Sequence, residues 1–467
     1  MIHVMFSKET YIARRKKLAA SVSGGILVFL GNNDSPANYP DNTYIFRQDS
    51  TFLYYFGLDL PHLAAVMDID SGGEMIFGDD VDMDDIIWMG PQKSMAEQAA
   101  AVGVGKTYPF ARLAAFVTDA AAKGRTVHYI PQYRADNMIL FGEMLGISPR
   151  LVNDGASEEF IRAIVSQRLI KEPCEIAEID RACDLGYAMH YTAMQLLKPG
   201  LLEQEVVGAM EGVVISGGYM TSFATILSQH GETLHNHVHD KVLTPGKLCV
   251  IDAGAEIASH YCSDFTRTLP VGGKFSQKQK EIYTIVSTAN SFAAEMARPG
   301  ITYREVHLAA SRLMLQGLKN VGLVKGDIDE ALALGVQGLF MPHGLGHNMG
   351  LDVHDMENLG ENYVGYDPGQ ERSRQLGLGS LRMARRLVPG HVITDEPGIY
   401  FIPALIEQWK AEGKFADFIN YQALEGYYDF GGIRLEDDIL ITPSGCRRLG
   451  SRRLPITVDE VEAAMAC

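Results

Sequence analysis

The sequence predicts a two-domain protein of the α+β class, with a smaller α/β domain before a larger domain built from two similar halves. Three observations support this prediction. Strand-like and helix-like segments alternate through the first third of the chain, a boundary follows near residue 169, and a spaced Pro-Gly pattern then occurs twice. We therefore expect one domain over residues 1–160 and a second over residues 170–467.

Apolar runs and turn residues define the elements of the first domain. The run Gly25–Leu30 has the length and composition of a buried strand, and a second run, Ala64–Ile69, ends at the turn Ser71-Gly72-Gly73. The alanine-rich segments Met95–Val102 and Ala111–Ala122 favour helices. Strands that alternate with helices in this way indicate an α/β layer domain.

The second domain begins with a helix and contains an internal repeat. After the boundary segment Leu169–Pro173, an amphipathic pattern predicts a long helix from Glu175 to Leu197. Pro199-Gly200 and Pro299-Gly300 each stand four residues before a Glu-Val pair. Because Pro is stiff and Gly tolerates a positive φ, each Pro-Gly is expected to end one helix and open the next.

A second Pro-Gly pair strengthens the repeat. Pro245-Gly246 stands five residues before Asp252, and Pro389-Gly390 stands five residues before Glu396. In both places the turn leads into a short apolar strand, over 247–251 and 391–395, that is expected to end on a carboxylate. Two similar halves that each deliver carboxylates predict a pseudo-symmetric site at the seam between them.

Composition excludes several classes of function. The 467 residues include 41 Lys and Arg against 58 Asp and Glu, a net charge of −17, which disfavours nucleic acid as a partner. No apolar run is long enough to span a membrane, and the short run Ile2–Phe6 does not resemble a signal peptide. The six cysteines lack CxxC spacing. We therefore expect a cytoplasmic protein with reduced thiols and no membrane partner.

Four carboxylates and one histidine are the strongest candidates for a metal site. Several follow apolar strand residues, where a lone carboxylate is costly to bury. Four in one site would repel one another unless two divalent cations neutralised them, and oxygen ligands with one imidazole suit Mn²⁺, Co²⁺ or Zn²⁺. The alternative is that each acid caps a strand or pairs with an arginine, such as Arg267 or Arg434. The five candidates are Asp252, Asp264, His347, Glu396 and Glu436.

A glycine-rich segment carries three of the 14 histidines, His343, His347 and His354. It superficially resembles the HExxH helix of zinc proteases, but Gly344 stands where the catalytic Glu belongs and two glycines disfavour a helix. We therefore interpret it as a loop that binds ligand and substrate. The basic segment Arg382–Arg386 is either a solvated helix face or a site for a substrate carboxylate.

These motifs resemble the pita-bread metallopeptidases, which include methionine aminopeptidase, aminopeptidase P and prolidase. The resemblance covers nearly the whole chain, and it implies a pseudo-two-fold pita-bread catalytic domain after a creatinase/aminopeptidase-P-type domain. The N-terminal domain is then expected to serve substrate access and oligomerisation. The matching segments are Phe46–Tyr55, Ile251–Glu256, Ser263–Thr268, His343–His347, Glu396–Tyr400 and Gly432–Asp437.

The resemblance also implies roles for individual residues. Asp252 would bind one metal, Asp264 and Glu436 would bridge two metals, and His347 and Glu396 would complete the second. A metal-bridging hydroxide would be the nucleophile and Glu396 the proton shuttle.

The remaining implied roles concern the substrate and the partner subunit. His235 and His354 would position the scissile carbonyl, with His343 and Arg434 among the substrate-binding residues. Trp88 would insert into a neighbouring subunit's active site, which implies a homodimer or a tetramer.

The expected substrate is a peptide with proline in the second position. The segment Ser380–Arg385 resembles the prolidase loop in which the residue matching Arg382 grips a dipeptide's free carboxylate. This favours an Xaa-Pro dipeptidase, prolidase. The alternative is an Xaa-Pro aminopeptidase, aminopeptidase P, that acts on longer peptides. A further alternative from another class is a metal-free creatinase-like hydrolase or a non-catalytic scaffold, although such relatives lose ligand residues and this chain keeps all five.

Overall fold

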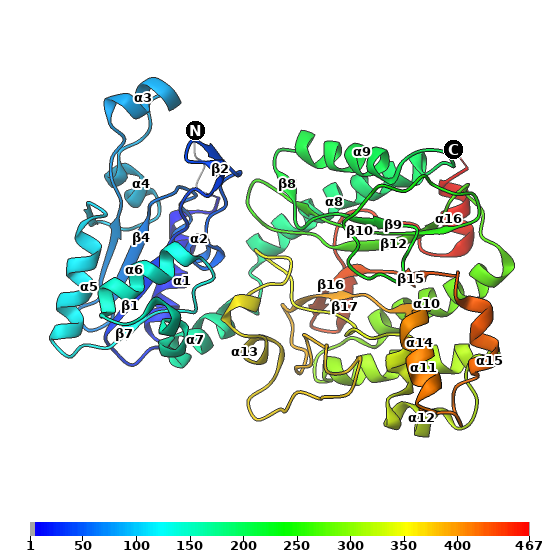
Figure 1. Cartoon of the computed structure of the whole chain (residues 1–467). Helices are drawn as coiled ribbons and strands as arrows, with labels where there is room; N and C mark the ends of the chain where they lie inside the picture. Colours follow the sequence, from blue (N-terminus) through cyan, green and yellow to red (C-terminus); the bar gives the residue numbers. More distant parts are fainter. Residues whose placement is uncertain (1–4, 467) are drawn as a thin grey trace. The chain divides into compact units, whose positions relative to one another are not determined.

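A computed structural model describes residues 5–466, and the chain divides into two compact units (Figure 1). Unit 1 comprises Met1–Arg168 together with Asn358–Tyr363, and unit 2 comprises Leu169–Glu357 and Val364–Cys467. A short piece of the later chain therefore belongs with unit 1, which the sequence boundary at residues 160–170 did not anticipate. Among the described residues, none of the helices combines the length and apolar character needed to cross a membrane.

Unit 1 is built around a mixed five-stranded sheet in the order β6-β5-β4-β1-β7. Strands β1, β4 and β5 are antiparallel neighbours, whereas β7 and β6 add in parallel at the two edges. The elements of this part of the chain are α1 (Lys8–Ala19), β1 (Ile26–Leu30), β2 (Pro36–Tyr39), β3 (Asn42–Thr43), α2 (Ser50–Phe56), β4 (Ala64–Asp68), β5 (Gly73–Phe77), α3 (Met83–Met89), α4 (Met95–Ala101), β6 (Thr107–Tyr108), α5 (Arg112–Ala122), β7 (Val127–His128), α6 (Ala135–Leu145), the 3-10 turns η1 (Pro149–Leu151) and η2 (Asn153–Gly155), and α7 (Glu158–Arg168).

Both faces of this sheet are covered, as the predicted layer domain requires. Val28 belongs to a core with Val117 of α5 and Phe141 of α6. Its neighbour Phe29 points to the other face of the strand, where its ring meets Phe160 of α7 with centroids 5.1 Å apart. A strand buried on both faces reads as a continuous apolar run, and this is why β1 was recognisable in the sequence.

The rest of the chain contains two small sheets flanked by long helices. The three-stranded sheets have the orders β12-β10-β9 and β13-β16-β17. The elements are α8 (Pro173–Leu196), α9 (Glu203–Ser216), β8 (Met220–Thr221), β9 (Ile226–Ser228), β10 (Leu248–Ala253), β11 (Ala255–Glu256), β12 (Phe265–Pro270), α10 (Gln277–Met296), α11 (Tyr303–Asn320), α12 (Ile328–Leu334), η3 (Val336–Leu339), η4 (Glu357–Leu359), α13 (Glu361–Gly365), β13 (Val392–Asp395), β14 (Gly398–Tyr400), α14 (Pro403–Ala411), α15 (Tyr421–Leu424), η5 (Glu425–Tyr427), β15 (Gly432–Arg434), β16 (Asp437–Thr442), β17 (Gly445–Arg448) and α16 (Val458–Ala464).

The internal repeat is visible in the backbone of unit 2. Helices α8 and α9 pack together beside the first sheet, and α10 and α11 pack together beside the second (Figure 1). The Gly200 N–H donates to the Leu243 carbonyl at 2.9 Å, and the Gly300 N–H donates to the Leu387 carbonyl at 3.0 Å. Equivalent turns are thus tied to equivalent chain segments in the two halves, which confirms that each Pro-Gly separates a pair of helices.

One detail of the predicted strands was wrong. The sequence suggested that the strand after Pro245-Gly246 ends before Asp252, but β10 continues to Ala253, and Asp252 pairs with Thr266 of β12. The antiparallel partner strand holds the backbone extended past the carboxylate. The equivalent strand β13 does end at Asp395, directly before Glu396.

The four glycines of the repeat have a left-handed backbone, which we expected for Gly200 and Gly300. Their φ values are 92° at Gly200, 79° at Gly246, 96° at Gly300 and 95° at Gly390. Gly300 and Gly390 differ in their surroundings. A Cβ atom at Gly300 would meet no atom within 4 Å, whereas one at Gly390 would lie 2.8 Å from Cγ2 of Ile170.

This contrast predicts a graded loss of stability. Gly300→Ala is expected to cost about 1 kcal/mol because an L-residue is strained in the left-handed region. Gly390→Ala is expected to cost more, because the new methyl group must also displace Ile170. Urea unfolding of both variants beside the unmodified protein measures the difference, and equal losses would contradict a role for the Ile170 contact.

Candidate metal centre and active site

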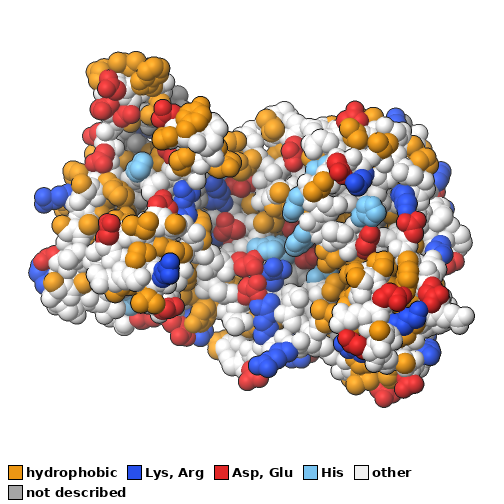
Figure 2. All heavy atoms as spheres, in the orientation of Figure 1, with side chains coloured by type: hydrophobic (Ala, Val, Ile, Leu, Met, Phe, Trp, Pro, Cys, Tyr) orange, Lys and Arg blue, Asp and Glu red, His pale blue; other side chains and the backbone are white. Residues whose placement is uncertain are grey.

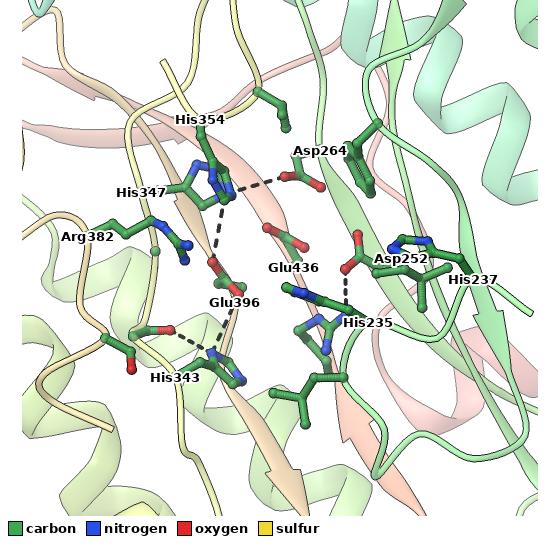
Figure 3. Close-up of a pocket in the computed structure, with 18 residues that line it drawn as sticks. His235, His237, Asp252, Asp264, His343, His347, His354, Arg382, Glu396 and Glu436 are labelled. Carbon is green, nitrogen blue, oxygen red and sulfur yellow. Dashed lines mark hydrogen bonds and ion pairs between the residues drawn. The ribbon is translucent and has the colours of Figure 1, made fainter. Parts of the chain in front are cut away.

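One pocket of about 320 Å³ in unit 2 gathers nearly all the residues that the sequence singled out (Figure 3). Figure 2 shows histidine side chains gathered on the same unit, beside acidic and basic groups. Trp88 is the exception, because it lies on α3 of unit 1 with 86% of its surface exposed. The predicted site residues that line the pocket are Asp252, Asp264, His347, Glu396, Glu436, His235, His343, His354, Arg382 and Arg434.

Each half of the repeat contributes two carboxylates to the pocket. Asp252 lies within β10 and Asp264 directly precedes β12, while Glu396 directly follows β13 and Glu436 directly precedes β16. The two halves join at this point, because the Glu436 N–H donates to the Thr266 carbonyl at 3.0 Å. The carboxylates are therefore fixed by paired backbone and not by mobile loops.

His347 faces these carboxylates with one ring nitrogen. Nε2 lies 3.4 Å from Asp264 and 3.8 Å from Glu396. Nδ1 lies 3.1 Å from the Asn348 carbonyl. Because a carbonyl only accepts, Nδ1 carries the proton and the Nε2 lone pair is directed at the carboxylate cluster, as in a metal-ligating histidine. Ligand atoms of Asp264, His347 and Glu436 all lie within 4.8 Å of one another.

The carboxylates of the pocket disfavour one another's ionisation. Burial raises the pKa of Asp264 and of Glu436 well above the ordinary range, and repulsion from neighbouring carboxylates raises them further. Burial also raises the pKa of Glu396. The same desolvation lowers the pKa of His347 and so keeps its imidazole neutral. Positive charge is therefore required for these groups to ionise together at neutral pH.

Unused oxygen atoms in the pocket fit a bound cation. Oδ1 of Asp252 and Oδ1 of Asp264 are buried and accept no hydrogen bond from any residue that the structure describes. Buried carboxylate oxygens without donors are costly unless a cation binds them. Carboxylate oxygens with one imidazole nitrogen form a ligand set suited to Mn²⁺, Co²⁺ or Zn²⁺. The residues present thus fit divalent metal ions.

Pairing with arginine explains only part of the cluster. Arg434 forms a buried ion pair with Asp252 and also donates to the hydroxyl of Tyr400 at 2.7 Å. Arg267 pairs instead with Asp437 at 2.6 Å, outside the pocket lining. Two guanidinium groups line the pocket, but Arg382 is paired with Glu357, so the four carboxylates exceed the positive charge available to them and the arginine alternative does not account for the site.

A second group of side chains lies beside the carboxylates. Glu357 accepts from Nδ1 of His354 at 2.5 Å and from Nε of Arg382 at 3.2 Å, and it thereby orients both. Burial lowers the pKa of His354 to about 4 and that of His343 to about 3. Both imidazoles are therefore neutral near pH 7, and each has one ring N–H, which His354 donates to Glu357 and His343 donates to the Gly344 carbonyl.

A buried ion pair holds the loop that carries His347 and His354. Lys171 and Asp355 lie 2.9 Å apart, with side chains only 1% and 2% exposed. The Asp355 N–H also donates to the Asn348 carbonyl at 2.9 Å. Asp355 follows His354 directly in the chain, so this pair fixes the backbone that carries both His347 and His354.

Sequence reasoning missed three residues of this site. His237 lines the pocket, Glu357 orients two of its side chains, and the Tyr400 hydroxyl lies 2.9 Å from Nε2 of His343. A signal for His237 was present, because His235 and His237 alternate in a histidine-rich segment. No sequence signal marked Glu357, because it lies in a loop whose residues follow no periodic pattern.

Comparisons with known proteins agree with this architecture. The sequence profile of metallopeptidase family M24 matches residues 177–443, and that of the aminopeptidase P N-terminal domain matches residues 11–129. The chain is 31% identical to the Xaa-Pro dipeptidase of Homo sapiens, over 98% of this chain and 92% of the relative. It is also 31% identical to the probable Xaa-Pro aminopeptidase pepP of Aspergillus niger, over 97% and 95%.

A solved structure extends the likeness to three dimensions. The Pseudomonas aeruginosa aminopeptidase PepP superposes with a TM-score of 0.80 at 27% identity, covering 99% of both chains. These matches confirm the predicted fold class, an aminopeptidase-P-type N-terminal domain followed by a pita-bread metallopeptidase domain. They also confirm the resemblance on which that prediction rested, and with it an enzymatic rather than a scaffold role.

The geometry predicts that metal binding depends on Asp264. Asp264→Ala removes one member of the Asp264–His347–Glu436 cluster and is expected to weaken Mn²⁺ binding by more than about tenfold. Elemental analysis after equilibrium dialysis measures this. The control is Asp240→Asn, which alters an acid that is 62% exposed and outside the pocket lining. Equal metal retention by both variants would contradict the proposed ligand set.

Proposed function

We propose that this chain, which belongs to metallopeptidase family M24, hydrolyses the bond between the first residue and proline in Xaa-Pro dipeptides. The observation that carries the choice is the position of Arg382 at the wall of the carboxylate pocket, where Glu357 holds it. A guanidinium group there suits the free carboxylate of a dipeptide, and it would close the site to longer chains. The relatives named Xaa-Pro dipeptidase support the same activity.

Asp252, Asp264, His347, Glu396 and Glu436 would hold two divalent ions in this proposal, with Mn²⁺ favoured over Co²⁺ and Zn²⁺. When bound, such ions acidify water and polarise the scissile carbonyl. The protein's own groups would do the rest.

Three side chains have proposed roles around the scissile bond. Glu396 lies 3.6 Å from His343 and 3.8 Å from His347, and its carboxylate would take a proton and return it during the reaction. His235 would donate a hydrogen bond to the carbonyl oxygen as its negative charge grows, and His354, whose single ring N–H is held by Glu357, would help to position that carbonyl. Proline after the cleaved bond provides no N–H, so these contacts must act on the carbonyl side.

An Xaa-Pro aminopeptidase is the second candidate. The Arg382 side chain is 37% exposed, so it does not seal the pocket by itself. The structural likeness to the P. aeruginosa aminopeptidase supports this reading. Hydrolysis of Ala-Pro compared with Ala-Pro-Ala, in Mn²⁺-loaded protein, separates the two candidates. Turnover of neither substrate would contradict both and favour a non-catalytic role.

Assembly and location are further parts of the proposal. Helix α3 presents three hydrophobic side chains beside the exposed Trp88, and Figure 2 shows this apolar surface over α3. Met83 and Ile87 are each 68% exposed and Met89 is 65% exposed. Such a patch suits contact with a second copy of the chain in a homodimer or tetramer. Cys183, Cys249 and Cys446 are free thiols, which supports a cytoplasmic location.

The carboxylate clamp predicts a change in length preference. Arg382→Ala is expected to lower kcat/KM for Ala-Pro at least about tenfold more than for Ala-Pro-Ala, since only the dipeptide offers its proline carboxylate. Arg382→Lys keeps the charge without the planar fork and is expected to fall between. Equal losses on both substrates would refute the clamp.

The exposed helix predicts a change in assembly. Trp88→Glu places a charge in the α3 patch and is expected to lower the mass measured by light scattering toward that of one chain. Tyr108→Glu is a matched control on another exposed aromatic residue of unit 1. An unchanged mass for Trp88→Glu would exclude α3 from the interface.

A further inference from the structure

The loop between β9 and β10 carries four histidines, and two of them line the pocket. His235 and His237 belong to the lining, whereas His230 and His239 do not. His239 Nδ1 donates to the Leu227 carbonyl at 3.0 Å, and His230 lies beside Glu232 at 3.1 Å. The proposed function assigns a role to His235 but none to His237.

Neighbouring side chains fix the direction of His237. Asn236 donates from Nδ2 to Ser228 Oγ at 2.9 Å, and its Oδ1 accepts from the Val238 N–H at 3.0 Å. Asn236 is therefore tied to β9, and its two neighbours in the loop, His235 and His237, both line the pocket. The His237 ring makes no hydrogen bond to any residue that the structure describes, so its N–H remains available to a ligand.

His237 marks the end of the pocket opposite the arginine. Figure 3 shows His237 and Asp252 on one side of the carboxylate cluster and Arg382 with His354 on the other. Ile226 lies on the His237 side as well, because it pairs with Asp252 across β9 and β10, and it lines the pocket. This end therefore combines an apolar wall with an imidazole at its exposed rim.

We infer that His237 recognises the side chain of the residue before proline and gives the enzyme a preference for an acidic residue there. The inference rests on the proposed function, since a proline carboxylate held at Arg382 places the first residue at the opposite end. A carboxylate accepts a stronger hydrogen bond from imidazole than a neutral group does. Asp252, which lies on the same side of the pocket, is paired with Arg434 and so does not repel an anionic side chain strongly.

The test compares Glu-Pro with Leu-Pro as substrates of the Mn²⁺-loaded full chain. The ratio of their kcat/KM values is expected to fall about tenfold in His237→Leu, which keeps bulk but removes the donor. His237→Gln retains a donor and is expected to preserve part of the preference. His230→Leu, in the same loop but outside the pocket lining, is the matched control and is expected to leave the ratio unchanged.

The outcomes separate this inference from the proposed function. An unchanged Glu-Pro to Leu-Pro ratio in His237→Leu, with Ala-Pro still hydrolysed by the unmodified protein, would overturn the role of His237 alone. A fall of the same size in His230→Leu would also overturn it, because the loop and not the imidazole would then be responsible. No turnover of any Xaa-Pro dipeptide by the unmodified protein would overturn the proposed function and this inference together.

Discussion

Four carboxylates buried in one pocket are the constraint on which the arrangement of unit 2 depends. A buried carboxylate is costly, and several side by side are tolerable only when they are held rigidly around positive charge. Backbone pairing provides this rigidity. Asp252 lies within one antiparallel sheet and Asp264 directly before one of its strands, while Glu396 and Glu436 adjoin the ends of two strands of another sheet. The Thr266–Glu436 hydrogen bond joins the two sheets. Strand pairing leaves little freedom for the carboxylates to move apart.

The groups around this centre depend on a smaller set of buried contacts. Glu357 orients His354 and Arg382 together, so one side chain links the histidine proposed to position the carbonyl with the arginine proposed to limit peptide length. The buried Lys171–Asp355 pair also fixes this loop, at the residue directly after His354. A buried ion pair adds little net stability, but the removal of one partner leaves an uncompensated charge. In this protein the Lys171–Asp355 pair serves to hold the loop backbone in position.

The sequence predicted this framework well because its signals are local and periodic. A continuous apolar run identified β1, and the Pro-Gly pairs identified the helix breaks on either side of Gly200 and Gly300. The misplaced end of β10 at Asp252 shows the limit, since the partner strand β12 extends it and no local signal records that pairing. Tyr400 was missed for the same reason, because its contact with His343 joins segments that are distant in the sequence. Glu357 was missed although His354 is only three residues away, because its loop has no periodic pattern. The Asn358–Tyr363 segment likewise belongs with unit 1 only through long-range packing.

The two halves of unit 2 are equivalent where they supply carboxylates and unequal in the connections that line the rest of the pocket. His235 and His237 lie in the connection before β10, whereas His343, His354 and Arg382 lie in the connection before β13, which has no counterpart of matching content in the first half. The connections and the carboxylate-bearing strands can therefore change independently of each other during evolution. Under the proposed function, substitutions in the connections can change which peptide is accepted. The repeated strands that carry the carboxylates can meanwhile stay unchanged, so substrate preference can evolve without loss of the metal ligands.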